Sequence, residues 1–134
     1  MSLMTDQIER LFKNHQQAMK NGLWFSGIEG EGEYKDWYKN NQIRVHCFYK
    51  DGNKDGEYKI WYDNGQIWVH CFYKDGEKDG EYKSWHENGQ IWAHCFYKDG
   101  DLSGEYKKWI NNGELIIHKL YKDGKFIEDY LNEF

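Results

Sequence analysis

The chain has 134 residues, about the length of one domain, and its 18 basic and 23 acidic residues give a formal net charge of −5. Aromatic residues make up 19%, 14 residues are glycine and none is proline, which excludes a mostly helical fold and predicts a β-rich protein with an aromatic core. The acidic balance excludes the basic surface that nucleic-acid binding requires, and no apolar run approaches the ~18 residues of a membrane span. Residues 1–6 lack the basic and apolar regions of a signal peptide, so we expect a cytoplasmic protein without membrane association.

The first predicted element is an amphipathic helix over residues 6–21. Its apolar side chains recur at helical spacing, from Ile8 through Leu11 to Met19, and Asn21-Gly22 ends it. We take residues 1–22 as a cap that covers the first strands or one end of the remaining fold. A helix that binds a partner is the alternative.

Residues 23–134 form a repeat array. Gly32, Gly56, Gly80 and Gly104 each open one 24-residue unit, and 11 positions of the unit are identical in all four copies. The predicted repeats are 32–55, 56–79, 80–103 and 104–127, followed by a partial copy over 128–134. A strict period of this kind indicates one supersecondary unit stacked repeatedly.

Each unit predicts two β-strands. In the second copy they are residues 57–62 and 66–73, joined by Asp63-Asn64-Gly65 and followed by a longer turn over residues 74–80. The expected fold is therefore all-β, an elongated antiparallel single-sheet meander of hairpins. Its end strands offer unpaired hydrogen-bonding groups through which two chains can join.

A three-residue loop, with a type I turn closed by glycine, sets the predicted register and places Ile60 opposite Trp68. In the first copy Asn41 takes the glycine position, which Asn tolerates. On this register one face carries the Cys residues and is the inner face, whereas each His lies opposite a Tyr on an outer face. The two most variable positions of the repeat also face each other there, as Asp36 with Arg44, Ile60 with Trp68, Ser84 with Trp92, and Lys108 with Ile116.

The middle of this outer face is the predicted partner surface. Two Trp residues beside charges have the composition of an interface hot spot. The candidate binding residues are Arg44, Ile60, Tyr62, Trp68, His86 and Trp92. The alternative is that these Trp side chains pack under the N-terminal helix or against a second copy of the chain.

Three His-Cys pairs, His46-Cys47, His70-Cys71 and His94-Cys95, suggest metal or redox chemistry. However, adjacent strand residues point to opposite faces, so one pair cannot share a metal. The loop over residues 51–56 resembles half of an EF-hand, but Tyr62 occupies the position that needs a bidentate Glu. No Ser or Cys recurs beside a His and a carboxylate as catalysis requires. We therefore expect no metal, no cofactor, no catalytic residues and no enzymatic activity.

The string from Tyr73 to Tyr82, YKDGEKDGEY, followed by Trp85 and Asn88-Gly89, resembles the MORN repeat. It is most similar to the bacterial variant whose unit runs Gly-Glu-aromatic-Lys-x-aromatic-aromatic-x-Asn-Gly. The resemblance covers about 100 residues, and it implies an elongated single sheet with roles in scaffolding and protein contacts, sometimes in membrane association and in antitoxin-like proteins.

The expected function is that of a non-catalytic protein-interaction or scaffold module, antitoxin-like if the bacterial resemblance extends so far. The alternative is an aromatic repeat that binds a small cation or carbohydrate, like choline- or wall-binding repeats, which hold quaternary ammonium groups over Trp and Tyr rings.

Overall fold

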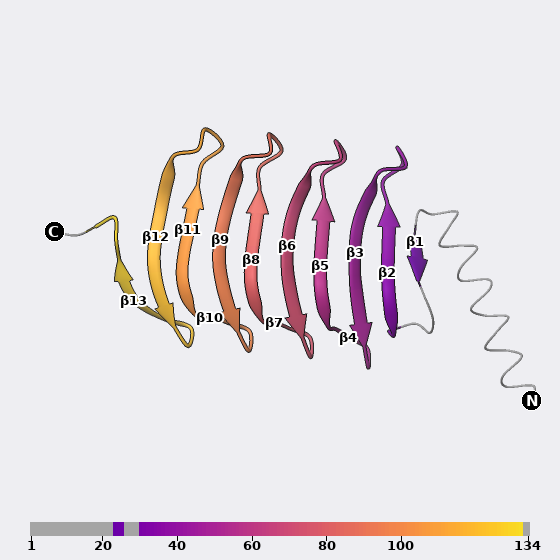
Figure 1. Ribbon diagram of the computed structural model, residues 1–134, viewed down its shortest axis with the longest axis horizontal. Helices are drawn as coiled ribbons and strands as arrows, with labels where there is room; N and C mark the ends of the chain where they lie inside the picture. Colours follow the sequence, from indigo (N-terminus) through magenta and orange to yellow (C-terminus); the bar gives the residue numbers. More distant parts are fainter. Residues whose placement is uncertain (1–22, 26–29, 133–134) are drawn as a thin grey trace, which may run out of the picture.

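The structure, a computed structural model, describes residues 23–25 and 30–132, so the predicted helix and cap lie outside the described residues. The described part is a single antiparallel sheet whose long strands follow one another in chain order, with no crossover (Figure 1). The predicted all-β hairpin meander is confirmed.

Four long hairpins make up the body of the sheet. They are β2 (Gly32–Trp37) with β3 (Ile43–Lys50), β5 (Gly56–Trp61) with β6 (Ile67–Lys74), β8 (Gly80–Trp85) with β9 (Ile91–Lys98), and β11 (Gly104–Trp109) with β12 (Leu115–Lys122). Short β1 (Leu23–Phe25) and β13 (Lys125–Asp129) form the two edges. Three two-residue strands, β4 (Asn53–Lys54), β7 (Glu77–Lys78) and β10 (Asp101–Leu102), pair with the end of the preceding long strand.

The turn inside each hairpin is the predicted three-residue loop. In the second repeat, the Tyr62 N–H donates to the Gln66 carbonyl at 2.8 Å and the Gly65 N–H donates to the Tyr62 carbonyl at 3.0 Å. Gly65 has a φ of 87°, and Asn41 takes the equivalent conformation at 70°. Both values lie in the left-handed region that Gly and Asn tolerate best.

A β-bulge follows this loop in every hairpin, and the sequence-based register did not include it. Trp61 pairs with Ile67 as predicted, but Ile60 pairs with Val69, so Trp68 is an extra residue between the two pairs. The bulge residues of the four hairpins are Arg44, Trp68, Trp92 and Ile116. The prediction that Ile60 lies directly opposite Trp68 is therefore wrong, because the bulge moves the rest of the strand by one residue.

This shift changes which strand positions share a face. Tyr58 pairs with Cys71 and Lys59 pairs with His70, so the predicted ladder of His opposite Tyr is wrong. We call the side that carries the Tyr58, residue 60, Val69 and Cys71 positions the cysteine face. The opposite side, with the Glu57, Lys59, His70 and Phe72 positions, is the histidine face.

The turn between repeats is shorter than the predicted span of residues 74–80. Asp75 and Gly76 both have positive φ, 51° and 85°, and Lys74 pairs directly with Glu77. This is a two-residue hairpin loop, for which Asp-Gly is a preferred sequence because both residues tolerate positive φ. The remaining residues of the predicted turn form β7 and the start of β8.

Side chains also connect each repeat to the next. The Asn64 Oδ1 accepts a hydrogen bond from the Gln66 N–H at 2.9 Å, while its Nδ2 donates to the Glu87 carbonyl of the following turn at 3.2 Å. The Tyr62 hydroxyl donates to the Trp85 carbonyl at 2.6 Å. Asn40 and Asn88 bridge consecutive turns in the same way. The bond within the turn also forms at Asn40, Asn88 and Asn112, which explains why Asn is identical in all four repeats.

We expect Asn64→Ala to lower the free energy of unfolding by about 1–2 kcal/mol, because it removes two hydrogen bonds. Asn112→Ala is the matched control: Asn112 accepts from the Glu114 N–H at 2.8 Å but, within residues 30–132, donates to no following turn. Urea titrations followed by Trp fluorescence should show the larger loss for Asn64→Ala. Equal losses would mean that the bond between turns contributes nothing.

Candidate binding groove

The smallest side chains of the sheet form the floor of the cysteine face. Cys47, Cys71 and Cys95 are each 1% exposed, Ser84 is 6% exposed and Ala93 is 8% exposed. They are buried although no second layer packs on this face within the described residues, so the shielding comes from larger rings around them. Burial raises the pKa of the Cys71 and Cys95 thiols to about 11. The prediction that the Cys residues are small buried residues is confirmed by this burial.

Tyrosine pairs border the floor on the side of the short strands. The rings of Tyr58 and Tyr73 pack edge to face with centroids 5.3 Å apart, and Tyr82 and Tyr97 do so at 5.9 Å. The Lys54 Nζ lies 4.6 Å from the Tyr58 centroid and 5.1 Å from that of Tyr73. The Lys78 Nζ lies at similar distances from the centroids of Tyr82 and Tyr97, 5.0 and 5.1 Å. Each of these two tyrosine pairs therefore binds an ammonium group of the protein itself.

Stacked rings border the floor at the end of the three-residue loops. Trp68 stacks on Tyr62 with centroids 4.8 Å apart, and Trp92 stacks on His86 at 4.7 Å. Tyr62 and His86 are in turn anchored to the next repeat, since the His86 Nε2 lies 2.9 Å from the Trp109 carbonyl oxygen. These Trp side chains lie on the cysteine face, not opposite it as predicted, because the bulge turns Trp68 and Trp92 toward the same side as Val69 and Ala93.

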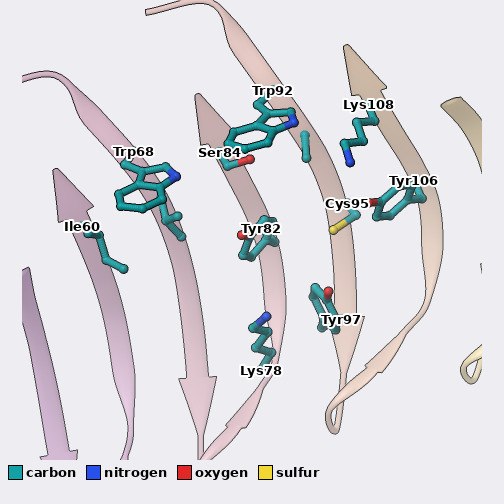
Figure 2. A pocket seen from close by; sticks show the side chains of 12 residues that line it. Ile60, Trp68, Lys78, Tyr82, Ser84, Trp92, Cys95, Tyr97, Tyr106 and Lys108 are labelled. Atoms are coloured by element: carbon teal, nitrogen blue, oxygen red, sulfur yellow. The ribbon is translucent and has the colours of Figure 1, made fainter. Parts of the chain in front are cut away.

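Two hollows lie between these borders. The first, of about 350 Å³, has Val69, Ala93 and Cys95 as its floor and Trp68 and Trp92 as walls. Figure 2 shows the two indoles at one end of this hollow and Lys78 and Tyr97 at the other. The second hollow, of about 340 Å³, continues over the fourth repeat and is lined by His86, Trp92, Lys108 and Ile116. We call the two hollows together the groove.

The first repeat has a buried ion pair on the same face. Arg44 donates from Nε and a terminal nitrogen to the two oxygens of Asp36 at 2.9 and 2.7 Å, and the Tyr34 hydroxyl donates to Asp36 at 2.9 Å. Asp36 is 2% exposed. The predicted contact between residues 36 and 44 is therefore confirmed for the side chains, although the backbone partner of Asp36 is Val45.

The structure thus places all six predicted binding residues on the cysteine face. Ile60 and Trp68 line the first hollow, Trp92 lines both, and His86 lines the second. Tyr62 supports Trp68, and Arg44 is occupied by Asp36. Sequence reasoning named Lys108 only as a variable position of the repeat, and it missed Lys78 and the floor of the groove. The signal for the floor is the set of small residues at positions 84, 93 and 95.

The histidine face carries the same contacts in the first three repeats. The His70 Nε2 lies 2.9 Å from a Glu57 carboxylate oxygen, and the Lys59 Nζ lies 3.5 Å from the other. In the fourth repeat the His118 Nε2 lies 3.7 Å from Glu105 and makes no hydrogen bond within the described residues. The hydrogen bond with His70 is the main reason that the pKa of Glu57 is lowered. Because Glu, Lys and His are identical at these positions in all four repeats, we assign them to the framework of the sheet.

Within residues 30–132 and the strand β1, no group of three or more His, Cys, Asp or Glu side chains is placed to hold a metal ion. The same residues include no helix with the length and apolar character needed to cross a membrane.

The geometry defines an open hairpin-repeat protein, in which every unit pairs with its neighbours in one sheet. The family model described as MORN repeat variant matches residues 30–51, 54–75 and 78–99, so three consecutive units of this chain are MORN-variant repeats. The β11–β12 hairpin, beyond the matched residues, has the same pairing and the same bulge. MORN repeats are a non-enzymatic type of repeat that generally binds proteins or membranes. No curated protein matches the chain.

Proposed function

We propose that the protein is a non-catalytic interaction module that binds a protein partner in the groove. The observation that carries the proposal is the position of the variable residues. The repeats share their framework residues but differ at the residues equivalent to Ile60 and Trp68, and these lie in or beside the groove. The contacts that hold the sheet together explain the residues that all repeats share. They do not explain the residues that differ, and these determine the shape and chemistry of the groove.

The chemistry of the groove supports a protein partner. Trp68 is 37% exposed although it is one of the largest apolar side chains. Exposed Trp beside cationic side chains is the composition found at the centres of protein interfaces. An antitoxin-like role in the cytoplasm, in which the groove binds and covers part of a toxin, is one form of this function.

The groove is less suited to a small cationic ligand than to a protein partner. Lys54 and Lys78 already place their ammonium groups against two of the tyrosine pairs. A choline-like ligand would have to displace a cation tethered to the same sheet, so the alternative function lacks an observation in its favour. Association of two copies through the β13 edge, where Phe126 and Ile127 are exposed, would leave the groove accessible.

We expect the double variant Trp68→Ala/Trp92→Ala to remain folded and to bind the partner about 30-fold more weakly or worse, a loss of about 2 kcal/mol. The partner would be recovered with the full chain by affinity purification from the native host. Calorimetric titration with the purified partner then gives the affinity, after circular dichroism has confirmed the fold of the variant.

The matched control is Phe72→Ala/Phe96→Ala on the histidine face. Phe72 and Phe96 are 36% and 37% exposed, which matches the 37% of Trp68. This variant removes two exposed aromatic rings without touching the groove, and it should bind as the parent does. Loss of binding in the Phe variant with full binding in the Trp variant would move the site to the histidine face.

A further inference from the structure

The charges of the groove differ from those of the whole chain. The chain has a formal net charge of −5, but the residues that line the groove include Lys78 and Lys108 and no carboxylate. On the histidine face, by contrast, each Lys has an acidic partner: Lys59 lies 3.5 Å from Glu57, and Lys107 lies 3.4 Å from Glu105. The groove is therefore a positively charged strip on an acidic protein, and its charge is complementary to an acidic ligand.

The shape of the groove fits an extended segment better than a compact ligand. The two hollows share Trp92 and Lys108, so they are continuous across the sheet. From Trp68 on β6 to Ile116 on β12 the path crosses four strand spacings of ~4.8 Å, or roughly 19 Å. An extended chain spans that distance with about six residues.

Each part of the groove selects a kind of side chain. The first hollow combines the apolar floor of Ala93 and Cys95 with the Trp68 and Trp92 walls, which suits a large apolar side chain. The second hollow, with Trp92 and Ile116, suits another. Between them the Lys108 Nζ lies 6.0 Å from the centre of the Trp92 ring, where it can meet a carboxylate.

We infer that the groove binds an extended, acidic segment of a protein in which two apolar side chains flank a carboxylate. This inference rests on the proposed function and specifies the chemistry of the partner. Lys108 supplies the charge and the two Trp residues supply the apolar contacts. An anionic membrane surface would use the lysines but would leave the two hollows without side chains to fill them, so we favour the protein segment.

The test uses the full chain and fluorescein-labelled ten-residue peptides with the pattern apolar–x–acidic–x–apolar. Matched peptides carry amides in place of the carboxylates, or serine in place of the apolar residues. Fluorescence anisotropy should show that the acidic apolar peptide binds at least about fivefold more tightly than either matched peptide, with an affinity that falls as salt rises.

Adjacent lysines on opposite faces provide the decisive pair of variants. Lys108→Gln should weaken the acidic peptide about fivefold and remove its advantage over the amide peptide. Lys107→Gln, which changes the net charge equally but on the histidine face, should bind as the parent does. Equal effects of the two variants, or equal binding of the acidic and amide peptides, would overturn the inference.

Other occupants of the groove give different results. Binding of phosphatidylserine vesicles that depends on Lys108, without binding of any peptide, would assign the groove to a membrane surface and overturn the inference. In another outcome, acrylamide fails to quench the Trp fluorescence of the full chain, and added peptide leaves that quenching unchanged. This result would assign the groove to a second copy of the chain or to residues 1–22, and it would overturn the inference. If the native partner needs Trp68 and Trp92 but neither Lys108 nor an acidic segment, the proposed function stands and this inference fails.

Discussion

Raising the pH from 9 to 11 is expected to lower the free energy of unfolding by about 2 kcal/mol for each of the Cys71 and Cys95 thiols. Burial raises the pKa of both thiols to about 11, from an ordinary value of 9.0. Burial also raises the pKa of Tyr58 and Tyr82 to about 12, from 10.0. At a pH between the ordinary pKa of a group and its raised pKa in the folded protein, the unfolded chain releases a proton that the folded sheet retains. The stabilising contribution is thus complete below pH 9 and is lost as the pH rises through 11 and 12.

Urea titrations at a series of pH values from 7 to 11.5, followed by Trp fluorescence, measure this loss. The double variant Cys71→Ala/Cys95→Ala is the control, because it removes the two thiols and should make the pH dependence between 9 and 11 clearly shallower, while the contribution of Tyr58 and Tyr82 remains. A parent protein whose urea midpoint stays constant over that interval would show that the floor of the groove is open to water. Parallel curves for the parent and the variant would show that other groups cause the pH dependence.

The features that depend on a few neighbouring residues were predictable from the sequence. The Asp63-Asn64-Gly65 loop has the residues that its backbone angles require, and the 24-residue period fixes the order of the hairpins. The grouping of Ile60 with Trp68 on one surface also survives, since the bulge leaves both side chains on the cysteine face.

The bulge itself was not predictable from local chemistry. Its residues in the four hairpins are Arg44, Trp68, Trp92 and Ile116, which include a cation, two aromatic residues and an aliphatic residue. Because strand side chains alternate, one extra residue exchanges the faces of everything beyond it. A pairing criterion would have detected the shift: the observed register places Glu57 and His70 on the same face, whereas a three-residue loop without a bulge places them on opposite faces.

Arg44→Ala is expected to destabilise the protein by about 3 kcal/mol, near the lower end of the range for breaking a buried ion pair. Arg44 donates two hydrogen bonds to the Asp36 carboxylate and the Tyr34 hydroxyl donates a third, and Asp36 is 2% exposed. Without Arg44 the carboxylate keeps the Tyr34 hydroxyl but loses its only paired cation among residues 30–132. The Arg44 side chain is itself 47% exposed, which lets water compensate in part and explains the choice of the lower value.

The repeats supply their own control for this prediction. The positions of Asp36 and Arg44 are taken by Ser84 and Trp92 in the third repeat, on the same bulge geometry. The double variant Asp36→Ser/Arg44→Trp removes the buried charge together with its partner, so it should recover most of the stability that Arg44→Ala loses. Urea titration at pH 7 compares the three proteins. If the double variant is no more stable than Arg44→Ala, the loss comes from the packing of Arg44 on the sheet and not from an uncompensated Asp36.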